Sequence, residues 1–303
     1  MNKFKSIEDI LGDPKGRYFG EGYKKVVYSQ KSKDETLEKI TSVFEIQYPS
    51  SWSTKKNIAS IKPHLSTIDS IVITIKLVTD FLREQLNFDE DTISNMVITE
   101  FTIKAGSVLV EDLKNIKAEL TLMAKNEFHF KGKVASFSVE LQVTLGGKLK
   151  KSNRDTGDDY YFSGFKLDNR SITNIELGTD LKSVCAITKI THSGSFSGIE
   201  SEYIFENRIS SILNQIIVTA ELTELLHSQL DDIPRELSKT LIMRKIKFIR
   251  KIPNNKKTGI VNKVEINVSK SKIVQLKGKS VRTSQMVSKF NNSTLIYSVA
   301  QEL

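Results

Sequence analysis

The stretch Pro63-His64-Leu65-Ser66-Thr67-Ile68-Asp69 leads into a segment that is apolar on nearly every face. The apolar residues that follow it are Ile71, Val72, Ile73, Ile75, Leu77, Val78, Phe81 and Leu82. A helix that is apolar all round must be buried, so the pattern predicts an interior helix over residues 66–86. His64 and Asp69 stand at its start, where two titratable groups meet a dry apolar interior, as general acid and base chemistry on an apolar substrate requires.

The same arrangement occurs again in the second half of the chain. A second wholly apolar helix is predicted at about residues 206–227. Each helix is followed by an acidic, chain-reversing stretch and then by a predicted strand. Ser94 and Ser238 occupy matching places in those strands, which sets the repeat at roughly 140 residues, an interval that suits a duplicated domain. The sequence therefore predicts two copies of one fold.

Alternation of apolar and polar residues predicts the strands of each copy. In the first copy they are 23–31, 39–49, 94–104, 117–125 and 133–145, which places the helix between two strands and three. In the second copy they are 159–177, 181–192, 239–250, 260–269, 272–283 and 293–300. An antiparallel sheet wrapped around one apolar helix is the hot-dog arrangement. The predicted fold class is α+β, a tandem (double) hot-dog.

A polar, glycine-rich stretch at 146–159 joins the two copies, as linkers do. We place the domain boundary inside it, so that residues 1–150 form an N-terminal hot-dog with a leader segment and residues 151–303 form a C-terminal hot-dog. A chain of 303 residues with 39% hydrophobic residues is large enough for two cores. No apolar run reaches the roughly 18 residues that a membrane span needs.

The start of the chain and its cysteine content bear on the cellular compartment. Residues 1–8 lack the apolar core of a secretory signal. The single cysteine, Cys185, allows no intramolecular disulfide. Both observations predict a cytoplasmic protein.

The net charge of +9 bears on the partners of the protein. Basic residues crowd near residues 244–257, where a strand would place Arg244 on the same face as Ile246 and Phe248. Nucleic-acid binding needs basic residues combined with stacking aromatics or a groove-reading helix, and neither pattern is present. An acidic partner uses the same charge more directly. We therefore expect Arg244, Arg250 and Lys251 to contact an acidic carrier protein or a phosphate group, and we expect neither nucleic acid nor membrane as a partner.

The spacing from Pro63 to Asp69 resembles that of hot-dog acyl dehydratases, in which a Pro-Gly pair precedes the helix and a catalytic acid follows the proline by six residues. The resemblance puts Asp69 at the acid position. In the second copy it puts Ser211 at the equivalent position, with Gln215 one turn later, where those enzymes often carry a glutamine. The sequence departs from the pattern before Pro63, because no His-x-x-x-Gly-x-x-x-x-Pro motif is present.

A closer resemblance extends over nearly the whole chain. The segments that carry it are Tyr18-Phe19-Gly20-Glu21-Gly22-Tyr23, Tyr48-Pro49-Ser50-Ser51-Trp52-Ser53, Pro63-His64-Leu65-Ser66-Thr67-Ile68-Asp69 and Thr240-Leu241-Ile242-Met243-Arg244. They resemble the bacterial avirulence protein D family, which directs synthesis of acylated sugar lactone elicitors, the syringolides. That chemistry is similar to that of hot-dog synthases that make A-factor butyrolactones from a β-ketoacyl donor and a hydroxylated acceptor. The resemblance supplies a reaction class and no catalytic residues.

Each candidate residue has a structural and a functional interpretation. His64 is either a catalytic base or a partner for a backbone group, and Asp69 is either catalytic or a first-turn acid favoured by the helix dipole. Ser66 and Thr67 fit N-caps better than nucleophiles. Trp52 either packs in the core or lines an acyl tunnel. The substrate-binding set predicted here is Trp52, Ser66, Thr67, Ser211, Gln215 and Arg244.

Three functional hypotheses follow. The first is an acyl-transfer enzyme that moves a β-ketoacyl group from an acyl carrier protein or acyl-CoA to a sugar or sugar-phosphate hydroxyl, with His64 as base and Asp69 orienting it or the substrate. The second is a dehydratase or thioesterase on the same fold, and the third is a lipid- or lactone-binding regulator without turnover. No cofactor is expected, and His129, His192 and His227 lack metal-ligand spacing. We also expect the protein to form a homodimer.

Overall fold

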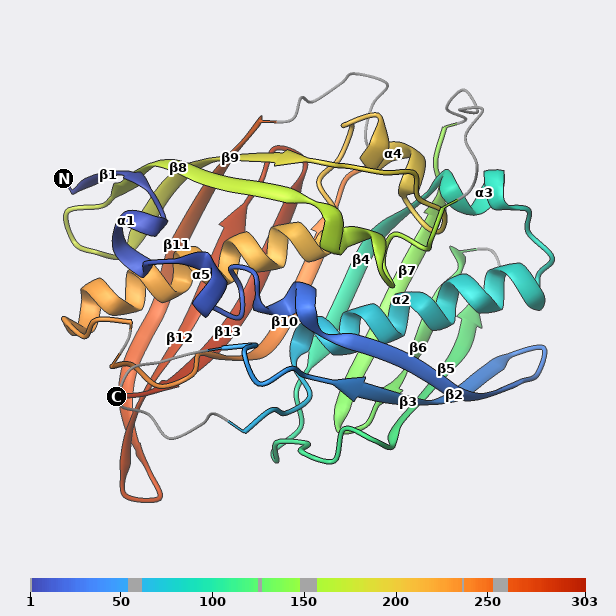
Figure 1. Ribbon diagram of the computed structural model, residues 1–303, viewed down its shortest axis with the longest axis horizontal. Helices are drawn as coiled ribbons and strands as arrows, with labels where there is room; N and C mark the ends of the chain where they lie inside the picture. Colours follow the sequence, from blue (N-terminus) through green and yellow to red (C-terminus); the bar gives the residue numbers. More distant parts are fainter. Residues whose placement is uncertain (1, 54–61, 125–126, 148–156, 236, 253–260) are drawn as a thin grey trace.

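The computed structural model describes residues 2–53, 62–124, 127–147, 157–235, 237–252 and 261–303 (Figure 1). Its helices are α1 (Glu8–Leu11), α2 (Thr67–Glu84), α3 (Glu90–Ser94), α4 (Ser201–Phe205) and α5 (Ile212–Asp231), with 3-10 turns η1 (Pro14–Gly16), η2 (Gly22–Lys25) and η4 (Gly164–Leu167). Its strands are β1 (Lys3–Ser6), β2 (Val27–Glu35), β3 (Lys39–Gln47), β4 (Met96–Lys104), β5 (Ile116–Ala124), β6 (His129–Val134), β7 (Phe137–Leu145), β8 (Asn169–Leu177), β9 (Ser183–Thr191), β10 (Ile242–Arg250), β11 (Val261–Leu276), β12 (Lys279–Lys289) and β13 (Ser293–Glu302).

The described strands form one 13-stranded sheet in the order β1-β8-β9-β11-β12-β13-β10-β4-β7-β6-β5-β3-β2. Outward from the central β4–β10 pair, one half runs β4-β7-β6-β5-β3-β2 and the other runs β10-β13-β12-β11-β9-β8. The two halves therefore repeat one topology, and each half curls around one long helix, α2 or α5 (Figure 1). This confirms the predicted double hot-dog.

A pseudo-twofold axis relates the two copies. A β-bulge interrupts β4 at Thr99 and β10 at Arg244, and the same interval along the chain separates the helix caps Ser66 and Ser211. That interval also separates Thr102 from Lys247, which pair directly across the seam between β4 and β10. A residue that pairs with its own counterpart lies on the symmetry axis. The axis therefore passes between these two residues, at the centre of the sheet.

The two predicted helices are present and buried. Every apolar residue of α2 from Ile71 to Leu82 has no measurable exposure, and the same holds for the apolar side of α5. The second helix begins at Ile212 and not near 206, because the side chain of Ser211 accepts the Asn214 N–H at 3.1 Å and caps it there. Residues 201–205 form the separate short helix α4.

Several strand predictions were wrong in extent. Residues 23–31 begin in η2 and join β2 at Val27, and residues 159–177 contain η4 before β8 begins at Asn169. The segment predicted as one late strand, 133–145, is a hairpin of β6 and β7, whose turn at Ala135 takes a positive φ of 48° without a glycine. Residues 260–269 and 272–283 are not two complete strands, because β11 continues through a bulge to Leu276 and turns at Gly278. β4 starts at Met96 after the short helix α3, so Ser94 lies in a helix, and Ser238 lies before β10, which starts at Ile242.

The first residues of the chain pack against the second copy. β1 pairs with β8, with Phe4 opposite Ile175. The buried Arg17 forms an ion pair with Glu221 of α5. The leader segment predicted as part of the N-terminal domain thus lies on the C-terminal copy. The predicted boundary at 150/151 lies outside the described residues and stays a prediction.

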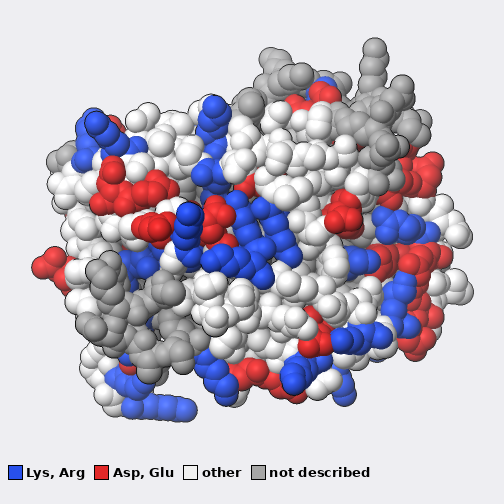
Figure 2. Space-filling model, in the orientation of Figure 1, with Lys and Arg blue, Asp and Glu red and all other residues white. Residues whose placement is uncertain are grey.

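One basic residue of the second copy, Arg250, is buried although the sequence predicted that it lies on the surface. Ile246, Phe248 and Arg250 alternate regularly and face the interior, and the bulge at Arg244 brings Met243 onto the same face. Arg250 is 3% exposed and pairs with Glu200, so the prediction that it contacts a carrier protein is wrong. Acidic and basic side chains are interspersed over the face in Figure 2. No helix in the described ranges is long and apolar enough to cross a membrane.

Candidate functional site

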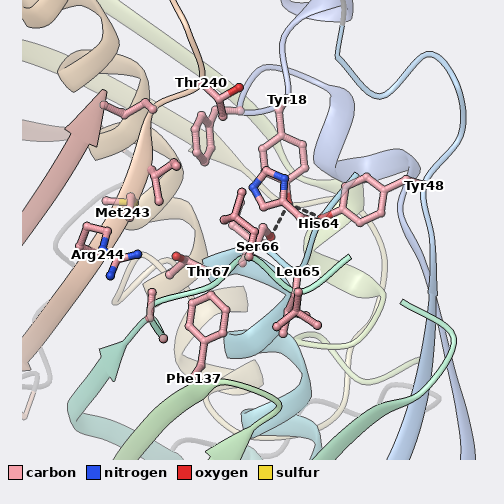
Figure 3. Close-up of a pocket in the computed structure, with 18 of the residues that line it drawn as sticks. Tyr18, Tyr48, His64, Leu65, Ser66, Thr67, Phe137, Thr240, Met243 and Arg244 are labelled. Atoms are coloured by element: carbon pink, nitrogen blue, oxygen red, sulfur yellow. Dashed lines mark hydrogen bonds between the residues drawn. The ribbon is translucent and has the colours of Figure 1, made fainter. Parts of the chain in front are cut away.

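A cavity of about 70 Å³ lies at the junction of the two copies (Figure 3). The start of α2, with His64, Ser66 and Thr67, forms one wall, and residues 240–244 at the start of β10 form another. The aromatic residues in its lining are Tyr18, Phe19, Tyr48, Trp52 and Phe137. The aliphatic ones include Leu65, Ile68, Leu109, Val110, Leu241 and Met243. The cavity is thus a mainly apolar space beside a helix N-terminus.

The first turn of α2 has two backbone donors without a partner next to this cavity. The Ser66 Oγ accepts the Asp69 N–H at 3.1 Å and the Ser66 carbonyl accepts the Ser70 N–H at 3.1 Å, so the later N–H groups of the turn are satisfied. The Thr67 and Ile68 N–H groups have no hydrogen-bond partner within the described part of the chain. Both residues line the cavity. Unpaired N–H groups at a helix N-terminus, reinforced by the helix dipole, favour a negatively charged oxygen.

Three aromatic side chains pack together in one wall of the cavity. Trp52 packs edge-on against Tyr18 and Tyr48, with ring centroids 5.4 Å and 5.2 Å apart. A Cβ added to Gly22 would lie 1.9 Å from the carbonyl oxygen of Trp52, so only glycine permits this approach of the two segments. Trp52, one of the predicted substrate-binding residues, is 7% exposed and lines the cavity.

Asp69 lies behind the cavity and does not line it. Its Oδ1 accepts the Tyr28 hydroxyl at 2.8 Å, and its Oδ2 accepts the Tyr48 hydroxyl at 2.5 Å and the Ser66 N–H at 2.7 Å. Burial raises the pKa of the Asp69 carboxyl, while these donors partly oppose the shift. The pKa of Tyr48 is raised well above its usual value by burial and by the Asp69 charge. Asp69 therefore positions Ser66 and Tyr48. Among the described residues, Asp69 forms no hydrogen bond with His64.

His64 faces the cavity and is partly exposed. Its Nδ1 lies 3.3 Å from the carbonyl oxygen of Lys62. A carbonyl can only accept, so this contact assigns the proton to Nδ1 and leaves Nε2 able to take a proton from a substrate. The Tyr18 hydroxyl lies 2.7 Å from Ser66 Oγ and forms the polar edge of the same space (Figure 3).

Arg244 comes to the cavity from the second copy. It is the bulge residue of β10, and its carbonyl accepts the Ala105 N–H at 2.9 Å. In the described residues its guanidinium has neither an ion pair nor a hydrogen bond. A cation without a carboxylate partner at the edge of an apolar cavity is available to a ligand. Arg244 was predicted as a substrate-binding residue, and the structure brings it together with His64, Ser66 and Thr67.

Ser211 and Gln215 do not reach the cavity. Ser211 caps α5 and accepts the Tyr160 hydroxyl at 2.9 Å. Gln215 donates to the Ser210 carbonyl at 3.0 Å and accepts the Ser293 hydroxyl at 2.6 Å. Both side chains are fully buried, so the polar glutamine at this apolar helix start has a structural reason.

The pseudosymmetric position beside α5 is filled with side chains. Arg250, the counterpart of Ala105, forms a buried ion pair with Glu200 and donates to the Ser210 carbonyl at 2.7 Å. Glu200 also accepts the Ile98 N–H at 2.8 Å and the Tyr161 hydroxyl. Among the described residues, the position that borders the cavity beside α2 is thus occupied beside α5 by a buried ion pair, so the two helix ends differ.

The sequence interpretation omitted the tyrosines that surround Asp69. Tyr18 and Tyr48 lie in segments that carried the family resemblance, which was the available signal, whereas nothing local marks Tyr28. Among the described residues, no group of three His, Cys, Asp or Glu side chains is placed to hold a metal ion.

Comparison with known proteins identifies the family of this chain. The family model for "Pseudomonas avirulence D protein (AvrD)" matches residues 2–152 and, a second time, residues 152–303. The chain belongs to the AvrD family. The resemblance drawn from the sequence is thereby confirmed, and the two matches correspond to the two copies of the fold. No curated protein matches the sequence.

Three solved structures are similar to this chain at low sequence identity. A TesB protein of Mycobacterium avium subspecies paratuberculosis has a TM-score of 0.44 at 5% identity, over 89% of this chain and 96% of the other. An acyl-CoA thioesterase II from Mycobacterium marinum has a TM-score of 0.41 at 6% identity, over 89% and 94%. The dehydratase domain from the CurJ module of the curacin polyketide synthase has a TM-score of 0.39 at 11% identity, over 91% and 96%.

Proposed function

We propose that this AvrD-family protein is an enzyme acting on acyl thioesters, which transfers a β-ketoacyl group from an acyl carrier protein or CoA to a hydroxyl of a sugar-like acceptor. The observation that carries the proposal is the meeting of two unpaired N–H groups, at Thr67 and Ile68, with His64 in one apolar cavity. Donors for an oxyanion, a base and a dry space are the elements that acyl transfer requires.

In the proposed reaction, an acceptor hydroxyl attacks the thioester carbonyl and its proton passes to His64 Nε2. The carbonyl oxygen becomes negatively charged and lies against the N–H groups of Thr67 and Ile68, which stabilise the tetrahedral intermediate. The carbon–sulfur bond then breaks, and the leaving thiolate takes the proton from His64. The products are an ester and a free thiol, and no cofactor is needed for atom or electron balance.

The remaining residues of the cavity have positioning roles. The Tyr18 and Tyr48 hydroxyls lie near Ser66 and offer hydrogen bonds to a polyhydroxylated acceptor. The apolar wall formed by Trp52, Leu65 and Phe137 suits the first carbons of an acyl chain. The AvrD family resemblance, which implies synthesis of acylated sugar lactones, supports the choice of a hydroxylated acceptor.

The test is mass spectrometry of reactions that contain purified protein, a β-ketoacyl thioester and a pentulose. We expect an ester or its cyclised lactone with wild-type protein, and a loss of about 10²–10⁴-fold in rate with His64→Gln, the range for a lost general base. The variant His129→Gln is the matched control, because His129 lies on β6 and does not line the cavity.

The outcomes separate the proposal from its alternatives. Release of free β-keto acid at the same rate with and without the acceptor identifies a thioesterase. Loss of water from a β-hydroxyacyl thioester identifies a dehydratase. Tight lactone binding without any turnover identifies a regulator. Full activity of His64→Gln would place the chemistry elsewhere.

A further inference from the structure

A groove of about 600 Å³ lies beside the cavity, and the two hollows share Ile242 and Arg244. The groove is formed almost entirely by the outer face of the second copy, from β10 to β11. We name it the basic groove and define it by Arg244, Lys270, Lys272, Thr283, Gln285 and Ser298. A ligand whose reacting end enters the cavity can therefore extend into the basic groove without leaving the protein surface.

The strand register gives the direction of the groove. Lys272 pairs with Thr283, Thr283 with Ala300, and Ala300 with Ile242, and all four residues line the groove. Because neighbouring strands lie about 4.8 Å apart, this row spans roughly 15 Å from the cavity edge to Lys272. The groove thus crosses the strands and leads from the cavity to a pair of lysines, Lys270 and Lys272.

The charge of the basic groove is uncompensated. In the described part of the chain, Arg244, Lys270 and Lys272 have no carboxylate partner. The acidic residue in the lining, Glu302, is engaged by Lys279 at 2.9 Å. Cations grouped in a concave surface without acids raise the local concentration of an anion. Lys270 and Lys272 are two residues apart on β11 after its bulge, so they point to the same side of the sheet.

The size of the cavity indicates where the rest of the donor must lie. At about 70 Å³ the cavity is far smaller than pockets that enclose whole ligands, which are about 300–1,000 Å³. An acyl thioester carries a long pantetheine arm that ends in a phosphate, whether it is bound to CoA or to a carrier protein. Such an arm needs an elongated path with a cationic end, and the basic groove supplies both.

We propose that the basic groove binds the phosphopantetheine arm of the thioester donor, with Lys270 and Lys272 holding its phosphate and Arg244 lying between that phosphate and the reacting carbonyl. This inference rests on the proposed function and adds the subsite by which the donor is recognised. The shared phosphate chemistry applies to both donors, and the experiment distinguishes them.

The test is the double variant Lys270→Glu/Lys272→Glu, assayed with four donors that share one acyl group. They are the CoA, carrier-protein and phosphopantetheine thioesters and the phosphate-free N-acetylcysteamine thioester. We expect KM to rise about tenfold or more for each phosphate-bearing donor, with kcat unchanged, and the effect to weaken at high salt. KM for the N-acetylcysteamine thioester should not change. The control is Lys131→Glu/Lys133→Glu on β6, which makes the same charge change on exposed residues outside the groove.

A binding measurement keeps this inference separate from the proposed function. Calorimetric titration with free phosphopantetheine should show binding to wild-type protein and a loss of about tenfold in affinity in the lysine variant, whatever the protein catalyses. An effect with CoA but not with the carrier-bound or free phosphopantetheine donor would assign the lysines to the nucleotide of CoA and overturn the arm-binding model. The arm-binding model would also be overturned if KM changed equally for all four donors, or if KM changed for none of them. If the protein binds phosphopantetheine but turns over none of the thioesters, the proposed reaction is wrong and the assignment of the groove still holds.

Discussion

Asp69 is a buried carboxylate whose hydrogen bonds come from hydroxyls and a backbone N–H. Tyr28 contacts one of its oxygens, while Tyr48 and Ser66 contact the other. Tyr48 and Ser66 line the cavity, and Tyr28 does not. The Asp69 carboxylate therefore connects Tyr28, which lies outside the cavity, to Tyr48 and Ser66, which line it.

The two tyrosines allow a matched test of this role. Tyr28→Phe and Tyr48→Phe each remove one hydrogen bond to the Asp69 carboxylate, so each should lower the free energy of unfolding by about 1.5–3 kcal/mol. Only Tyr48→Phe removes a hydroxyl from the cavity, so only that variant should lower kcat/KM. Denaturant unfolding and steady-state kinetics measure the two effects. Equal kinetics in both variants would remove Tyr48 from the site.

Asp159 gives a pH-dependent prediction. It accepts the Tyr161 N–H at 2.9 Å, its Oδ2 has no hydrogen-bond partner, and burial raises the pKa of this carboxyl to about 6. A folded-state pKa above the unfolded value of 3.8 means that the contribution to stability is present at low pH and is lost as pH rises through about 6.

Asp159→Asn mimics the protonated acid at every pH. Its free energy of unfolding relative to wild type should therefore increase between pH 4 and pH 7, by up to about 3 kcal/mol, since one pKa unit is worth about 1.4 kcal/mol. Denaturant unfolding at both pH values measures this. A constant difference between the two proteins across that range would contradict the assignment.

At the scale of elements, the two long helices share one capping device and differ in what surrounds it. Ser66 caps α2 and Ser211 caps α5, and each accepts the N–H three residues later at 3.1 Å. A tyrosine hydroxyl contacts each serine, from Tyr18 in one copy and from Tyr160 in the other. The α2 cap borders the cavity, whereas the α5 cap, Ser211, is fully buried among the described residues.

Replacing each cap by alanine separates folding from function. Ser66→Ala and Ser211→Ala should each lower the free energy of unfolding by about 0.5–2 kcal/mol, the usual value of an N-cap. Only Ser66→Ala should also reduce turnover, because it disturbs the Thr67 and Ile68 N–H groups. Thermal unfolding and product assays test the pair, and an equal loss of turnover in both variants would argue against a single site beside α2.

At the scale of the whole molecule, the duplication is symmetric in the sheet and asymmetric at the helix ends. One end holds the cavity, and the other holds the ion pair of Glu200 and Arg250, both almost fully buried. Taking one partner from a buried pair leaves an uncompensated charge, whereas replacing both is often tolerated. The ion pair therefore has a structural role distinct from the chemistry beside α2.

The corresponding variants are Arg250→Met and Glu200→Gln/Arg250→Met. The single change should lower the free energy of unfolding by about 3–5 kcal/mol, and the double change should recover most of that loss. The amide oxygen that Glu200→Gln introduces still accepts the Ile98 N–H, and the turnover of the folded double variant should equal that of wild type. A double variant no more stable than the single one would show that the charge pair is not the stabilising element.

The sequence by itself determined the duplication, both interior helices and the candidate position at the start of the first. These features depend on local patterns: apolar faces, capping serines and strand alternation, which act over a few residues. His64, Ser66 and Thr67 were predicted at the cavity on that basis, and the structure places them there. Turns without a glycine or proline signal, such as the one at Ala135, gave no local warning, so β6 was missed.

Only the tertiary structure decided which of the two matching helix ends is hollow. Arg250 was assigned to the surface because it is charged, although it shares the strand face of Ile246 and Phe248, and it lies in the interior because Glu200, from a remote segment, pairs with it there. Asp69 was assigned to the site because it stands at the start of the helix, but Tyr28 and Tyr48, which come from distant strands and loops, hold its carboxylate behind the cavity. Burial and pairing depend on which remote segments meet, and one residue's shift in strand phase exchanges interior and surface, so no local pattern specifies them.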